Sequence, residues 1–138
     1  MSNVLYTAFK RDALKKIHDL VNDDIKVALV NGYTVDQDGH AGYSDITNEV
    51  ANGNGYTTGG VSLTSKAVTA DNTNHRGKYS ADNASWSDST ITATGAVIYN
   101  NTASGKPLIA YIDFGGTKSD QASIFTIQWD STGVLYLG

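Results

Sequence analysis

The chain has 138 residues, of which 40% are hydrophobic and 17% are charged. This length is enough for one buried core, so we expect a single domain over residues 1–138. No apolar run approaches the roughly 20 residues that cross a bilayer, and residues 1–12 lack the pattern of a secretory signal. We therefore expect a soluble globular protein with no membrane partner.

The net charge and the absence of cysteine exclude further kinds of partner and site. The formal net charge is -4, whereas nucleic-acid binding depends on clustered Lys and Arg, so we expect no nucleic-acid partner. The chain has no cysteine, which excludes disulfides, thiolate metal sites and cysteine nucleophiles. The fold must therefore be held by packing and hydrogen bonds.

The first element expected is an amphipathic helix over residues 4–21. Apolar residues recur there at steps of three to five, from Leu5 and Phe9 through Leu14 to Val21. The pattern ends at Asn22–Asp24, whose side chains favour turns over a helix interior. His18 is expected on the surface of this helix.

From residue 25 to 138 the pattern changes to short strands rich in Ile, Val, Thr and Tyr. The predicted strands are Ile25–Val30, Val61–Thr64, Lys66–Thr69, Ile91–Asn100, Leu108–Phe114, Ser123–Asp130 and Val134–Gly138. The predicted turns are Asn100–Pro107, Gly115–Asp120 and a tight hairpin at Asp130–Gly133. Short turns join antiparallel strands. The fold class expected is mainly β, of α+β type: one antiparallel β-sandwich or barrel-like domain with one N-terminal helix.

Two segments are less regular. The polar stretch Asp71–Thr90 is expected to hold an irregular or edge strand, anchored by apolar residues such as Tyr79 and Trp86. The stretch Asp36–Gly42 is expected to be a long mobile loop.

The stretch "NGNGYTTGG", Asn52–Gly60, resembles a phosphate-binding loop at first sight. Gly53 and Gly55 fit the start of G-x-G-x-x-G, but the third position is Thr58, and no lysine or helix follows as a P-loop requires. We therefore predict an architectural role, in which the glycines supply positive φ angles and Tyr56 anchors the segment to the core.

Asp36, Asp38 and His40 are the only metal candidates that we single out, and they are weak ones. An EF-hand loop starting at Asp36 needs glycine at position six and Glu at position twelve, but Gly39 is at position four and Thr47 at position twelve. We favour an acidic surface loop. A hydrolase based on Asp36 and Asp38 is disfavoured because no cleft or partner pattern accompanies them. No catalytic residue, metal or cofactor is expected.

Several motifs taken together resemble a family of small structural proteins of tailed bacteriophage virions. The resemblance runs from Leu5 to Leu137 and includes an opening helix, "IKVALV", S-D-I-x-x-E-V, G-x-G-Y-T-x-G-G, a W-x-x-S-T-I-T-A strand and "IDFG". The positions that match the two central motifs are Ser44, Asp45, Ile46, Glu49, Val50, Gly53, Gly55, Tyr56, Thr57, Gly59 and Gly60.

This resemblance implies a non-enzymatic virion protein, made in the bacterial host cytoplasm and located on the capsid surface. It implies a capsid decoration or cement protein that binds the major capsid protein and copies of itself, with a trimer as the state suggested by analogy. The alternative is a tail or head-fibre component that binds a host receptor or glycan. The eight tyrosines and two tryptophans would suit such a binding face, although core packing explains most of them.

Overall fold

The computed structural model describes residues 3–130 and 133–137. The fold is mostly β, with 47% strand and 8% helix, and its sheets are antiparallel. The first elements are β1 (Val4–Leu5), α1 (Thr7–Leu14), β2 (Ile25–Val30), the 3₁₀ turn η1 (Tyr43–Asp45), β3 (Val61–Ser62) and β4 (Ala67–Asp71). They are followed by β5 (Arg76–Ser80), β6 (Ala84–Ser89), β7 (Thr92–Asn100), β8 (Leu108–Ser119), β9 (Ser123–Ile127) and β10 (Leu135–Leu137).

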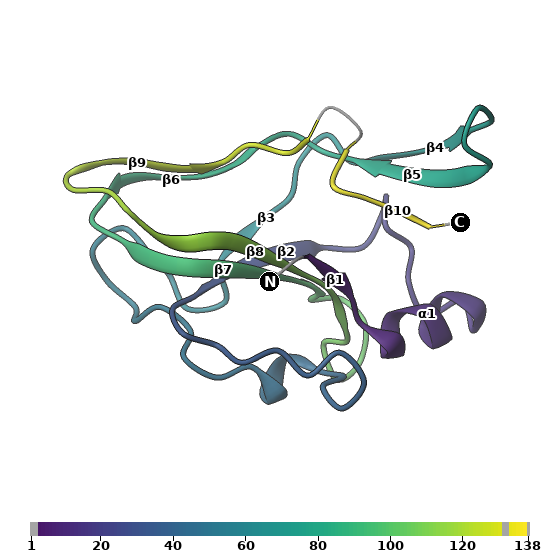
Figure 1. Cartoon of the computed structure of the whole chain (residues 1–138), viewed down its shortest axis with the longest axis horizontal. Coiled ribbons are helices and arrows are strands. Elements are labelled where there is room, and N and C mark those ends of the chain that lie inside the picture. The colour runs from purple at the N-terminus through teal and green to yellow at the C-terminus, as the bar shows by residue number, and fades with distance from the viewer. Residues whose placement is uncertain (1–2, 131–132, 138) are drawn as a thin grey trace.

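The strands form two layers, as expected for a β-sandwich-like domain (Figure 1). One layer is a five-stranded sheet in the order β1-β8-β7-β2-β3. The other consists of the pair β6-β9 and the three-stranded sheet β10-β5-β4, which lie end to end in Figure 1. The helix lies at the end of the molecule where β4, β5 and β10 are found.

The core lies around β2, β7 and β8. β2 is a central strand, because β7 and β3 pair with its two edges. Five of its six residues are buried, including Ala28 and Val30. Buried apolar side chains from Tyr6 to Val134 belong to one hydrophobic cluster.

The helix is much shorter than predicted. It covers Thr7–Leu14 instead of residues 4–21, and Val4–Leu5 is a strand paired with β8. Phe9 is buried, but Leu14 is 91% exposed, and of the later apolar residues Leu20 is only partly buried against the core.

Backbone hydrogen bonds explain why α1 ends early. Ile17 N–H donates to the Asp12 carbonyl at 3.0 Å, and Lys16 N–H donates to the Ala13 carbonyl at 3.3 Å. Lys16 has a φ of 59°, so these bonds form a Schellman motif with lysine in the left-handed position. Asp19 Oδ1 then accepts the amides of Val21 and Asn22, so the chain continues in a turn held by this side chain.

The strands of the second half are mostly where the sequence predicts them, with two corrections. The stretch Gly115–Asp120, predicted as a turn, belongs almost wholly to β8, which continues to Ser119. Gly115 and Gly116 have positive φ, and the register with β7 shifts between Ala93 and Gly95, so the glycines make a bulge within a paired strand.

The second correction concerns Asp71–Thr90, which holds two regular strands, β5 and β6, anchored by buried Tyr79, Ala84 and Trp86. In the hairpin predicted at Asp130–Gly133, the Gly133 N–H donates to the Asp130 carbonyl at 2.8 Å. Residues 131 and 132 of that turn, and residue 138, lie outside the described residues.

Candidate interaction surface

The three metal candidates have separate partners in the structure. Asp36 Oδ1 accepts the amide of Gly39 at 2.9 Å, and Asp38 Oδ1 accepts the hydroxyl of Thr7 at 2.6 Å. His40 Nδ1 lies 2.6 Å from the Tyr33 hydroxyl. In the part of the chain that the structure describes, no group of three metal-ligating side chains lies close together. The structure therefore does not bring Asp36, Asp38 and His40 together as a metal site.

The loop Asp36–Gly42 is instead joined to the N-terminal region. Thr7 N–H donates to the Gln37 carbonyl at 3.0 Å, and Gln37 Nε2 donates to the Leu5 carbonyl at 2.8 Å. Asp38 thus lies at the start of α1, where a negative charge is favourable. The loop predicted to be mobile is bound at its centre to the first two elements of the chain.

The S-D-I-x-x-E-V motif organises backbone rather than a reaction site. Asp45 Oδ2 accepts the amides of Ala41 and Gly42, at 2.9 and 3.1 Å, which closes the turn η1. These bonds lower the pKa of the Asp45 carboxyl. Ser44 is exposed.

Glu49 is the centre of a tyrosine cluster. Its carboxylate accepts hydrogen bonds from the hydroxyls of Tyr43 and Tyr56 and from the amide of Gly59, the last at 2.7 Å. Burial first, and then the hydrogen bond to Glu49, raise the pKa of both tyrosines. Tyr56 also accepts the amide of Leu29 in β2 at 3.1 Å. The cluster therefore fastens the glycine segment to the core sheet.

The glycine segment has the geometry that its sequence predicts. Gly53, Gly55, Gly59 and Gly60 all have positive φ, and Tyr56 is buried, so both parts of the architectural prediction are confirmed. A Cβ on Gly60 would lie 1.8 Å from the Val27 carbonyl oxygen, and one on Gly55 would lie 2.7 Å from Ser89 Cα. No side chain fits at these two places.

An open groove lies between α1 and the sheet β10-β5-β4. Its volume is about 220 Å³, and a wider hollow of about 570 Å³ shares three of its lining residues, His18, Leu20 and Val68. Val68 and Leu135 are both directly opposite Tyr79, so these three side chains lie on the sheet face that covers the groove.

Exposed apolar side chains surround this groove. Ile17 and Val21 are 41% and 42% exposed and line the wider hollow, while Val68 and Leu137 are 53% and 43% exposed. Single exposed apolar residues are ordinary on a protein surface, whereas four around one groove form a patch typical of a binding face. We call Ile17, Val21, Val68 and Leu137 the apolar rim.

His18 closes the inner end of the groove and is not the helix-surface residue that the sequence predicts. His18 follows the end of α1, and the centre of its ring lies 5.2 Å from the centre of the Phe9 ring. Its Nδ1 atom lies 3.1 Å from Asn100 Nδ2. Its Nε2 atom is buried and, among the described residues, has no hydrogen-bond partner. Burial lowers the pKa of this imidazole, while the charges of Asp12 and Asp23 act in the opposite direction.

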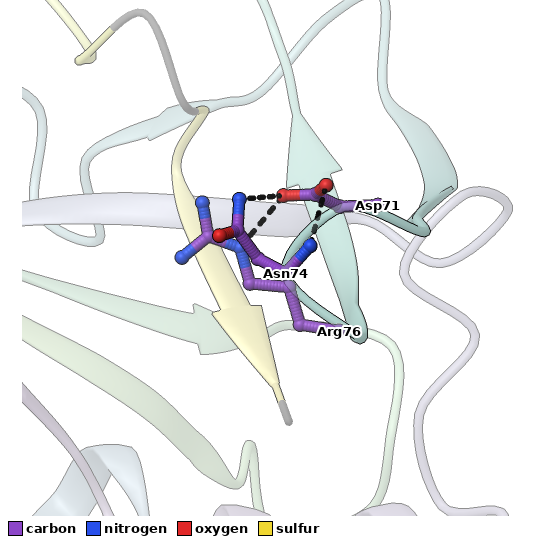
Figure 2. A network of polar contacts seen from close by, with 3 residues as sticks. All are labelled: Asp71, Asn74 and Arg76. Atoms are coloured by element: carbon purple, nitrogen blue, oxygen red, sulfur yellow. Dashed lines mark hydrogen bonds and ion pairs between the residues drawn. The ribbon is translucent and has the colours of Figure 1, made fainter.

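The tip of the β4–β5 hairpin, beside the groove, is held by one polar network (Figure 2). Asp71 Oδ2 accepts hydrogen bonds from Asn74 Nδ2 at 3.0 Å and from Arg76 Nε at 2.9 Å. The bond from Asn74 is the largest of the effects that lower the pKa of Asp71 to about 2. The Arg76 guanidinium also lies 3.8 Å from the centre of the Tyr136 ring in β10. This network fixes β4 and β10 to the same central strand.

Comparison of the chain with protein-family models, with curated proteins and with solved structures finds no match. No described helix is long and apolar enough to span a bilayer. The candidate site therefore rests on the geometry of this chain alone, and the feature described here is an apolar groove.

Proposed function

We propose that this chain is a non-enzymatic structural protein of a tailed-phage virion, a decoration or cement protein that binds the major capsid protein on the outside of the head. The observation that carries the proposal is the groove with its apolar rim. It presents the exposed side chains of Ile17, Val21, Val68 and Leu137 around one groove, which suits the apolar centre of a protein–protein interface.

The role of the motif residues supports this assignment. Glu49, Tyr56 and Gly60, which carry the resemblance to virion proteins, all hold the backbone in place. A protein that covers a shell needs a rigid surface, and symmetry on the shell multiplies a modest contact many times.

The aromatic residues give less support to the glycan-binding alternative. Trp86 is buried, and the Trp129 indole N–H donates to the Asp82 carbonyl at 2.9 Å. Tyr136 is 49% exposed, but Arg76 lies over its ring. Its ring face is therefore already occupied, whereas a sugar would need it open.

The test is a binding assay with phage heads and tails that lack this protein. The purified chain is added, particles are sedimented, and bound protein is located by electron microscopy. We expect the wild-type chain to saturate the outer surface of heads. Ile17→Asp and Val21→Asp should reduce binding at least tenfold, because a carboxylate in a desolvated contact is costly.

Ile124→Asp is the matched control, since Ile124 is also exposed but lies on β9, away from the groove. It should bind as the wild type does. Binding to tails alone would replace the proposal with the fibre alternative. Binding to neither particle would reject both, and equal binding by all three variants would remove the groove as the contact surface.

A further inference from the structure

The outer edge of β4 is an unprotected strand edge. β4 ends the sheet β10-β5-β4, and no described residue forms a backbone hydrogen bond with its outer side. Figure 1 places the β4–β5 hairpin at the periphery of the molecule. Its first four residues, Ala67–Ala70, carry no charge and no proline, the usual devices that block pairing of an open edge.

The register shows which backbone groups face outward. The Tyr79 carbonyl points to the β10 side, since it accepts the Val134 amide at 2.8 Å. Tyr79 is directly opposite Val68, so that pair is not hydrogen bonded and the Val68 backbone points away from β5. Backbone groups of successive residues in a strand point to alternate sides, so the Ala70 backbone points the same way as that of Val68. Val68 and Ala70 therefore present their N–H and C=O groups at the outer edge of β4.

We propose that this edge pairs with β4 of a second copy, antiparallel, about a two-fold axis through Thr69. In that register Val68 of each copy faces Ala70 of the other, and these two pairs exchange four backbone hydrogen bonds. Thr69 meets its own counterpart as a close pair without backbone hydrogen bonds, a favourable cross-strand combination.

Charge does not oppose this arrangement. Asp71 would face Ala67 of the second copy, so the two carboxylates do not meet, and Asp71 is already bonded to Asn74 and Arg76 (Figure 2). The two-fold axis is perpendicular to the sheet, so the sheet face that carries the helix lies on the same side in both copies. The two grooves therefore lie on the same side of one six-stranded sheet.

β9 offers a second uncharged edge, and it serves as the comparison. A hollow of about 430 Å³ beside it is lined by Lys118 of β8 and by Asp120, which follows β8, so charged groups lie close to this strand. We expect β4, and not β9, to be the edge that pairs. The contact involves few residues, so association should be weak and dependent on concentration.

The decisive test uses the isolated full chain with a single introduced cysteine, since the wild type has none. Close antiparallel pairs of this kind have Cα atoms about 4.5 Å apart, within disulfide range. Thr69→Cys should therefore form a disulfide dimer under mild oxidation, while Thr126→Cys on β9 stays largely monomeric. Equal crosslinking of the two variants, or none at Thr69, overturns the proposal.

A charge pair tests the register independently. Thr69→Lys and Thr69→Glu should each weaken self-association several-fold in sedimentation velocity, because like charges would face each other across the axis. Mixing the two variants should restore a dimer. Failure of the mixture to associate, with both variants folded by circular dichroism, or a wild-type trimer that Thr69→Lys leaves intact, overturns the proposed pairing. The test needs no phage particle, so its result is separate from that of the capsid assignment.

Discussion

Glu49 and the glycines of Asn52–Gly60 act on the protein backbone, and their effect on stability can be measured residue by residue. Glu49 joins two tyrosine hydroxyls and one amide, and Gly60 lets the chain pass directly against β2. Loss of either should affect folding before it affects any binding event. Gly53 and Gly60 allow this to be tested, because both have positive φ angles but only Gly60 lies close to other backbone atoms.

Gly60→Ala should lower the free energy of unfolding by roughly 2 to 4 kcal/mol. The new Cβ would collide with the β2 backbone, and alanine is also strained at a positive φ. Gly60 has a φ of +83°, and its Cβ would lie 1.8 Å from the Val27 carbonyl oxygen. Gly53→Ala is the control: its φ is +117°, but nothing lies within 4 Å, so only the strain of about 1 to 2 kcal/mol remains. Urea unfolding measures both. Equal losses would mean that the close approach to β2 is unimportant.

At the scale of elements, α1 shows how a tertiary contact limits a helix. Its buried side chains are Ala8, Phe9 and Asp12, all within the first two turns. The helix ends where the Schellman motif turns the chain, although the apolar spacing continues to Val21. The exposed continuation of that spacing supplies Ile17 and Val21 to the apolar rim.

Substitutions at the two ends of α1 should therefore differ sharply. Phe9→Ala should cost about 3 to 5 kcal/mol of unfolding free energy, since it leaves a cavity in the core. Leu14→Ala should change stability by no more than about 0.5 kcal/mol, because the side chain is 91% exposed. Thermal and urea unfolding measure the difference. A large loss with Leu14→Ala in dilute, monomeric protein would contradict the exposed position of this residue.

The whole molecule is stabilised by buried tyrosines. Burial raises the pKa of seven of them, to about 12 for Tyr99. The others are Tyr6, Tyr33, Tyr43, Tyr56, Tyr79 and Tyr111. An unfolded tyrosine loses its proton near pH 10, so above that pH the folded state holds more protons than the unfolded state. Stability is therefore fully present below pH 10 and decreases as the pH rises above it.

We expect cooperative alkaline unfolding that starts above pH 10. Tyrosinate absorbance and far-ultraviolet circular dichroism would monitor it. Tyr99→Phe removes one of the groups responsible, so between pH 10 and 12 the loss of stability per pH unit should fall by at most about 1.4 kcal/mol. At neutral pH the same variant loses its hydrogen bond to the Gly59 carbonyl, at a cost of about 1 kcal/mol. An unchanged slope would show that Tyr99 ionises freely in the folded protein.

Much of the element order was predictable from the sequence. Strands such as β2, β7 and β9 appear where β-branched and aromatic residues cluster. The predictions failed where a local pattern has two structural outcomes. A pair of glycines such as Gly115 and Gly116 is compatible with a turn or with a bulge. The pairing of this segment with β7 makes it a bulge. The polar residues of β5 and β6 hide a strand pattern because one face of each meets solvent.

By itself the sequence determined the class of the fold, the architectural role of Asn52–Gly60 and the burial of Tyr56. These follow from residue chemistry that acts locally: period-two apolar patterns, and glycines, which adopt positive φ without the steric cost of a Cβ. Only the tertiary structure decided the length of α1, the tyrosine cluster around Glu49, the apolar groove and the open edge of β4. Each of these depends on which segments, distant along the chain, lie side by side, and burial and strand pairing are properties of that arrangement.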